Sequence, residues 1–231
     1  MDQRSVLILL LSLFFIILII AKMGWTAEHN AIASLNQTIK LNGMKIGEGS
    51  IKVIVYLDFN CPFSQKFFEQ VYPRIINSNT SFFFKCLPST RNSREVCKFV
   101  YCSYKQGKLN ESMKLIFENK GEWNYLTTPE LRVKLKEYAK LLKEDTPSFI
   151  SCLQDESLDE LINSFYDESN ELGISGTPSF VVIARKDKNS VISSAKIVEA
   201  KSVFYSNKEY IILIEGNRPF TYFKSFFERL S

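Results

Sequence analysis

The sequence has a single histidine, His29, in a chain of 231 residues. Catalytic triads and cysteine–histidine pairs need a base within hydrogen-bond reach of the nucleophile, and His29 lies in a stretch that we interpret as a spacer. None of the five cysteines forms a C-x-x-C pair, so the common zinc-binding spacing is missing as well. We therefore expect no histidine-dependent hydrolysis and no metal site.

The sequence also has no internal repeat, no low-complexity tract and no block of basic residues. The net charge of +4 is spread over mixed lysine and glutamate, which gives no support for a nucleic-acid partner. Apolar residues make up 45% of the chain and charged residues 23%, as in ordinary folded proteins. This length and composition predict one medium-sized folded domain with an appended segment.

The appended segment is an uncharged apolar run, Val6–Ala21, near the N-terminus. Its length is at the short end of the range that crosses a bilayer and the long end of a signal peptide's apolar region. Because Lys22-Met-Gly-Trp25 is a poor cleavage site, we favour a signal anchor or transmembrane segment over residues 1–22. Residues 23–44 then form a spacer, and residues 45–231 the folded domain.

The most informative local feature is Cys61, at the junction of a predicted strand, Lys52–Phe59, and a predicted helix. The helix begins at Pro62, a residue favoured at the first helical position, and continues to about Ile76. Free N–H groups and the positive end of the helix dipole stabilise a thiolate at such a position. The pattern indicates a reactive cysteine, and the alternative is a buried structural cysteine that ends a strand.

The other elements follow from periodicity and turn residues. Phenylalanine and aliphatic residues at helical spacing are expected to face the core from the Cys61 helix: Phe63, Phe67, Phe68, Val71 and Ile75. The pattern further predicts a short opening strand around the Asn42-Gly43 turn, strands 81–87, 179–184 and 210–215, a turn at 186–190 and a closing helix at 219–230. The stretch 191–207 fits an extra hairpin.

Two motifs together carry a resemblance to a known family. Asp58-Phe-Asn-Cys61-Pro-Phe-Ser64 resembles the D-x-x-C-P-x-C segment of DsbA-like thioredoxin-fold oxidoreductases. Gly173-Ile-Ser-Gly176-Thr177-Pro178 is similar to the family's G-x-x-G-T-P loop, whose proline is cis and faces the active cysteine. The resemblance implies an α/β thioredoxin fold with a helical insertion, here at about 93–172. It also implies that the domain lies outside the cytosol.

One departure from the family pattern concerns Ser64, which stands where the family usually has a second cysteine. In a C-x-x-C pair the second thiol resolves the mixed disulfide that the first thiol forms. Cys61 therefore needs an outside thiol for release, which disfavours a self-contained dithiol oxidase. The hydroxyl of Ser64, one helical turn along, can hydrogen-bond the thiolate.

Residues near the cysteine have candidate roles. Asp58, three residues before Cys61, is the nearest acidic residue and a candidate for hydrogen-bond or proton support at the helix start, and the alternative is a surface-side strand residue. The candidates for substrate contact lie beside the cysteine and in the downstream loop: Pro62, Phe63, Thr177 and Pro178. In this fold the backbone of that loop pairs with an extended substrate peptide.

An odd number of cysteines in an exported chain predicts one free thiol, which fits Cys61. The other four allow three complete pairings, and spacing does not choose among them. Pairs at similar positions in some relatives favour a Cys102–Cys152 disulfide. Cys86 is then a buried thiol or a partner of Cys97.

These observations favour a membrane-anchored thiol–disulfide oxidoreductase that acts by monothiol exchange on protein cysteines. Its domain is expected in an oxidising extracytoplasmic compartment, either the periplasm or cell exterior or the lumen of the endoplasmic reticulum. We expect no bound cofactor, with glutathione or another thiol as co-substrate, and the redox partner is not identified. The alternatives are a redox-inactive binding or chaperone module, a monothiol glutaredoxin-like protein and a kappa-type glutathione-dependent protein.

Overall fold

The computed structural model describes residues 37–76, 79–206 and 208–231. The chain divides into two units, residues 1–39 and residues 40–231, and the second carries every element described below. The predicted membrane segment at residues 1–22 lies outside the described residues. Within the described part of the chain, no helix has both the length and the apolar character that a membrane span requires.

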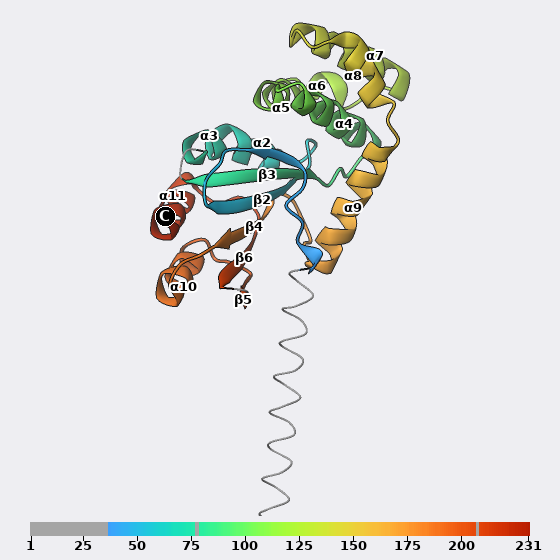
Figure 1. The fold of residues 1–231 in the computed structure, drawn as a ribbon. Helices are drawn as coiled ribbons and strands as arrows, with labels where there is room; N and C mark the ends of the chain where they lie inside the picture. Colours follow the sequence, from blue (N-terminus) through green and yellow to red (C-terminus); the bar gives the residue numbers. More distant parts are fainter. Residues whose placement is uncertain (1–36, 77–78, 207) are drawn as a thin grey trace, which may run out of the picture. The chain divides into compact units, whose positions relative to one another are not determined.

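The centre of the domain is a sheet with the strand order β1-β3-β2-β4-β6-β5 (Figure 1). The strands are β1 (Met44–Ile46), β2 (Ile51–Leu57), β3 (Thr80–Cys86), β4 (Ser179–Ala184), β5 (Ser202–Ser206) and β6 (Glu209–Glu215). The central strands β2 and β3 are parallel, and every other neighbouring pair is antiparallel. Their β-branched and aromatic residues are buried on both faces, as expected for central strands.

The connection between β2 and β3 carries two short helices, α2 (Pro62–Gln70) and α3 (Tyr72–Ile75), rather than one helix to Ile76. The break at Val71 precedes Pro73, which has no N–H to continue the helical hydrogen bonds. The prediction that Phe63 faces the core was wrong, because its side chain is 60% exposed. It lies in the first turn of α2, whereas the core-facing rings of the helix, Phe67 and Phe68, lie one turn later.

Six helices lie between β3 and β4, in the region expected for the insertion (Figure 1). They are α4 (Arg91–Lys105), α5 (Leu109–Glu118), α6 (Lys120–Trp123), α7 (Thr128–Leu141), α8 (Thr146–Leu153) and α9 (Ser157–Glu171). Helices α4 to α8 lie together, and α9 runs back from them to the sheet. We call α4 to α8 the helical block.

Two expectations at the edges of the sheet differ from the structure, the first of them only in part. The predicted opening strand is present as β1, but Thr38 is helical and the chain bends at Gly43 without a hairpin. The stretch 191–207 is not a hairpin by itself: it holds most of α10 (Lys188–Ile197) and the edge strand β5, which pairs antiparallel with β6. The supposed turn before it is the start of α10, where the Asp187 side chain accepts a hydrogen bond from the Ser190 N–H and caps the helix.

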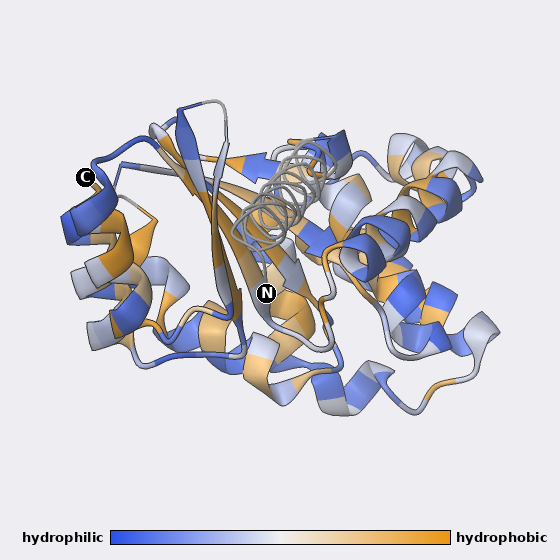
Figure 2. Cartoon of the chain, turned by 90° about the horizontal axis from the view of Figure 1, so that it is seen from below, coloured by the Kyte–Doolittle hydropathy of each residue, from blue (hydrophilic) through white to orange (hydrophobic). Residues whose placement is uncertain are grey.

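The main core lies on one face of the sheet, under α2, α3 and α11 (Phe220–Leu230). In Figure 2 the strands are coloured largely as hydrophobic, whereas the helices carry both colours. The core is rich in rings, with Phe67 of α2 in edge contact with Phe180 of β4 and Phe223 of α11. Edge-to-face packing of this kind adds to the burial of apolar area. It fixes the direction in which α2 leaves the sheet, and with it the place of Cys61.

The opposite face of the sheet holds a buried ion pair. Lys85 of β3 and Glu168 of α9 are 2.6 Å apart, and their side chains are 0% and 4% exposed. Glu168 also accepts hydrogen bonds from the Tyr56 hydroxyl, at 2.7 Å, and from the Lys40 N–H, at 3.3 Å. This network attaches α9 to the two central strands.

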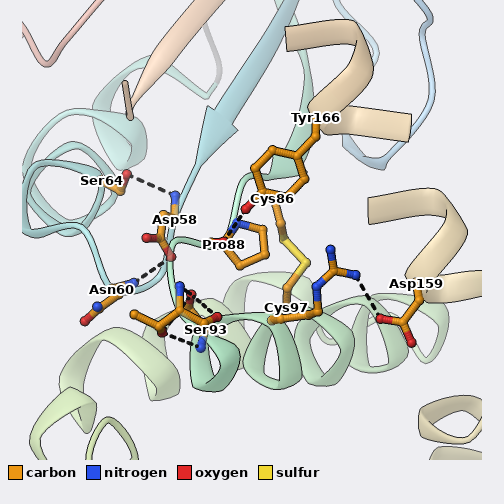
Figure 3. Close-up of a disulfide and its surroundings, with 11 residues drawn as sticks. Asp58, Asn60, Ser64, Cys86, Pro88, Ser93, Cys97, Asp159 and Tyr166 are labelled. Atoms are coloured by element: carbon orange, nitrogen blue, oxygen red, sulfur yellow. Dashed lines mark hydrogen bonds and ion pairs between the residues drawn. A yellow bond between two sulfur atoms is a disulfide. The ribbon is translucent and has the colours of Figure 1, made fainter. Parts of the chain in front are cut away.

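Two disulfides connect the insertion. Cys86 at the end of β3 is bonded to Cys97 of α4, with Cα atoms 6.2 Å apart (Figure 3). Cys102 of α4 is bonded to Cys152 of α8, with Cα atoms 5.8 Å apart. The second pair is the one that the family resemblance implied, and the first settles between the two alternatives for Cys86. Cys61 is the free cysteine, as the odd number predicts.

Candidate active site

Cys61 occupies the N-cap position of α2, in extended backbone conformation, and Pro62 is the first helical residue. Its carbonyl accepts the first helical hydrogen bond, from the Gln65 N–H at 3.2 Å. The side chain is half-buried, so the sulfur is neither enclosed in the core nor fully in solvent. The free N–H groups of the first turn and the dipole of α2 point at this end of the helix.

The Cys61 thiol donates a hydrogen bond to the Thr177 carbonyl oxygen, and the two atoms are 3.1 Å apart. The Thr177–Pro178 peptide bond is cis, as the family resemblance implied. The fold therefore brings together two motifs that lie 116 residues apart in the sequence. Pro178 is buried and Thr177 half-buried, so the loop presents its backbone beside the sulfur.

The loop that carries Thr177 is held by residues in and next to the last two strands, β6 and β5. Glu215 of β6 accepts hydrogen bonds from the Ser175 N–H at 2.9 Å and from the Lys201 ammonium at 3.0 Å. The same ammonium donates to the Gly173 carbonyl at 2.7 Å. Burial opposes ionisation of Glu215, but the Ser175 N–H and the Lys201 ammonium outweigh it and hold its pKa below the usual range.

Asp58 is a buried residue that orders the turn leading into Cys61. Its carboxylate accepts hydrogen bonds from the Asn60 N–H, at 3.0 Å, and from the Ser89 N–H, at 3.1 Å, as well as from the Ser89 hydroxyl. Figure 3 shows Asp58 beside the β3–α4 connection, close to the Cys86–Cys97 disulfide. Its contacts fit hydrogen-bond support of the turn, since its partners are the Asn60 and Ser89 N–H groups and the Ser89 hydroxyl.

Ser64 is buried, and its hydroxyl oxygen accepts a hydrogen bond from the Asp58 N–H at 3.3 Å (Figure 3). The hydroxyl thus ties the first turn of α2 to the end of β2. The expected hydrogen bond from Ser64 to the Cys61 sulfur is not among the contacts in this structure, because the side chain is turned toward the strand. Pro62 and Phe63 are exposed next to Cys61, where a bound peptide can touch them.

The thioredoxin family model matches residues 41–199 of the chain, which include both motifs of this site. The chain belongs to the thioredoxin family. No curated protein sequence matches it.

Solved structures share the fold of this chain. Wolbachia pipientis alpha-DsbA1 has 23% identity and a TM-score of 0.63, over 82% of this chain and 90% of that one. The thiol-disulfide exchange protein alpha-DsbA2 from the same organism has 16% identity and a TM-score of 0.64, over 89% and 97%. Bacillus subtilis BdbD has 20% identity and a TM-score of 0.51, over 61% and 80%. The two Wolbachia neighbours are DsbA proteins, so the chain has the DsbA-like form of the thioredoxin fold.

Three residues of this thioredoxin-family site carry no signal in the sequence. Lys120 of α6 donates a hydrogen bond to the Asn60 carbonyl, and Lys201 and Glu215 hold the Thr177 loop. Each is one of many charged residues on the surface, and only the packing of the insertion and of β5 brings it to the site. Among the described residues, no group of three histidine, cysteine or acidic side chains is arranged to hold a metal ion.

Proposed function

We propose that this thioredoxin-family protein catalyses thiol–disulfide exchange on protein cysteines, with Cys61 as its only reactive thiol. The observation that carries the proposal is the half-buried Cys61 sulfur at the N-terminus of α2, 3.1 Å from the Thr177 carbonyl. A structural cysteine would be paired or enclosed in the core, whereas this one lies where an extended peptide would pair with the loop.

The exchange begins when the Cys61 thiol gives its proton to solvent. The thiolate attacks one sulfur of a substrate disulfide, a bond forms between that sulfur and Cys61, and the other sulfur leaves with the electron pair as a thiolate. The N-terminus of α2 favours the thiolate both before attack and when it is the leaving group. Thr177 supplies the backbone along which the substrate strand lies, and Phe63 supplies apolar contact.

Release requires a thiol from outside the site. Ser64 occupies the position of the resolving cysteine, and the other four cysteines are in disulfides. An external thiolate therefore attacks the mixed disulfide and frees Cys61, which gives isomerase-like or reductase-like turnover. Glutathione or another small thiol fits this role as co-substrate.

The test is formation and release of a mixed disulfide with a cysteine-containing peptide, followed by mass spectrometry. The wild-type protein should form the adduct and release it only when an external thiol is added, and C61S should form none. S64C places a thiol one helical turn from Cys61 and should release the peptide without external thiol. A wild-type protein that forms no adduct, while its Cys61 reacts with small alkylating agents, would refute the proposal.

A redox-inactive binding module is the second candidate. It is favoured by the replacement at Ser64, because the exposed Phe63 and the Thr177 backbone can hold a peptide without any reaction at sulfur. In that case C61A would bind peptides as tightly as the wild-type protein, and oxidised and reduced peptides would bind equally. Stronger binding or turnover with disulfide-containing peptides favours the enzyme.

We further propose that the domain is anchored to a membrane through residues 1–22 and faces an oxidising extracytoplasmic compartment. The support is the apolar run Val6–Ala21 together with two disulfides, which persist in such compartments and are rare in the cytosol. The test is membrane fractionation with alkaline extraction, followed by protease treatment of sealed vesicles or cells. Release of the protein from membranes by alkali would contradict the anchor, and a protease pattern that places the domain on the cytosolic side would contradict the compartment.

A further inference from the structure

Lys120 is a cation at the active-site turn that comes from the insertion rather than from the thioredoxin motif. It is the first residue of the short helix α6, and its ammonium donates a hydrogen bond to the Asn60 carbonyl, 60 residues away in the sequence. Asn60 immediately precedes Cys61. The side chain is half-buried, and no carboxylate among the described residues forms an ion pair with it. An ammonium group has three donors, so two are left for a ligand.

The ammonium lies close enough to Cys61 to act on a charged reactant there. The Asn60 carbonyl oxygen is one peptide unit from the Cys61 Cα atom, so standard bond lengths keep the Lys120 nitrogen within roughly 8 Å of the sulfur. At that separation the electrostatic energy between two unit charges in water is enough to change a reaction rate about twofold, and the effect is larger where the protein excludes solvent. The N-terminus of α2 adds a positive field at Cys61.

The acidic groups nearby are occupied elsewhere. The first turn of α2 contains no acidic residue. The Asp58 carboxylate is buried and accepts hydrogen bonds from Ser89 and from the Asn60 N–H. Glu122 of α6 is paired with the Lys134 ammonium at 2.8 Å. The side of Cys61 that Lys120 borders is therefore suited to an anion.

We propose that Lys120 selects an anionic low-molecular-weight thiol, one that carries a carboxylate, as the external resolving thiol of Cys61. This inference rests on the proposed monothiol exchange. The incoming thiolate bonds to the Cys61 sulfur, the disulfide bond between Cys61 and the substrate breaks, and the substrate cysteine leaves with the electron pair. One disulfide forms as one breaks, so no further oxidant or reductant enters. The carboxylate of the incoming thiol lies against the Lys120 ammonium during the attack.

The experiment uses the full protein with Cys61 converted to its mixed disulfide with thionitrobenzoate, whose release is followed by absorbance. Three probes differ in charge: 3-mercaptopropionate, 2-mercaptoethanol and cysteamine. Each rate is divided by the rate at which the same thiol attacks a small-molecule mixed disulfide of thionitrobenzoate. This division removes the differences in intrinsic nucleophilicity among the three thiols. The wild-type protein should then prefer the anionic over the cationic thiol by about fivefold at low salt, and less at high salt.

Substitutions at Lys120 should change this ratio in a graded way. K120R should keep the preference, K120Q should bring it close to one, and K120E should reverse it. K114Q is the matched control, because Lys114 is an exposed lysine of α5 that faces Glu118 at 3.7 Å, and it should behave as wild type. A preference that K120Q and K120E leave unchanged would overturn the inference. Failure of the proposed function is recognised by a different result, namely that peptide disulfides form no adduct with Cys61.

Discussion

Replacing Lys85 with methionine should lower the free energy of unfolding by about 3–5 kcal/mol, because the buried Glu168 carboxylate then has no counter-charge. Methionine has a similar length and keeps the apolar contacts of the lysine stem. In the native protein the Lys85 ammonium donates to both carboxylate oxygens of Glu168, at 2.7 and 2.6 Å. Burial lowers the pKa of Lys85, although Glu168 opposes this. Burial and the adjacent Glu168 charge raise the pKa of Tyr56.

The magnitude follows from what remains around Glu168 in K85M. The Tyr56 hydroxyl and the Lys40 N–H still donate to it, so the loss is mainly that of the charge partner. A loss of this size is a large part of the roughly 5–15 kcal/mol typical of folded domains. E168Q removes the charge but keeps the shape, so K85M/E168Q should lose clearly less than the sum of the two single variants.

The assay is urea unfolding at neutral pH, followed by far-ultraviolet circular dichroism, with the slope of the transition compared among variants. R185M is the matched control, because Arg185 pairs with Glu209 at 2.9 Å but is 77% exposed. An exposed pair of that kind is worth at most about 1 kcal/mol. A loss in unfolding free energy for K85M no larger than that for R185M would refute the role of the buried charge pair. Fully additive losses for K85M and E168Q would refute it as well.

Three further predictions concern the insertion and the Thr177 loop. The carboxylate oxygens of Glu144 have no hydrogen bond, and burial raises the pKa of this group. The free energy of unfolding of the wild-type protein should therefore fall as pH rises above the ordinary carboxyl range. E144Q should remove that fall in urea titrations at several pH values. C102A/C152A removes a disulfide that closes a loop with a sequence separation of 50. On the chain-entropy model the free energy of unfolding should fall by about 4 kcal/mol in the same assay, and a loss below about 1 kcal/mol would contradict this. E215Q and K201M should slow adduct formation with a cysteine peptide severalfold while changing stability by less than about 1 kcal/mol, and an unchanged rate would show that the loop needs neither residue.

The local signals in the sequence were sufficient for the centre of the site. An apolar β-branched run followed by cysteine and proline predicts a strand that ends where a helix begins, and β2, Cys61 and α2 have this arrangement. Propensity and proline chemistry act over a few residues, so they are readable without the fold. The odd number of cysteines likewise predicted one free thiol.

The same local reasoning failed where position within the fold decides the outcome. Helical spacing put Phe63 on the apolar face of α2, but its ring is exposed while Phe67 and Phe68 on the same helix are buried. Spacing allowed Ser64 to reach the sulfur, yet its hydroxyl accepts a hydrogen bond from the Asp58 N–H at the end of β2. The stretch 191–207 has weak periodicity, and the helix α10 in it is stabilised by its Asp187 cap and by packing on α11.

The sequence by itself determined that a single thiol lies at the start of a helix and that a Thr-Pro step follows far downstream. Only the tertiary structure decided that the Cys61 sulfur and the Thr177 carbonyl meet, and that Lys120 from the insertion and Lys201 from the last strands support them. The physical reason is range: backbone preference is set by neighbours in the chain, whereas a contact across 116 residues depends on how the sheet orders its strands and where the inserted helices pack.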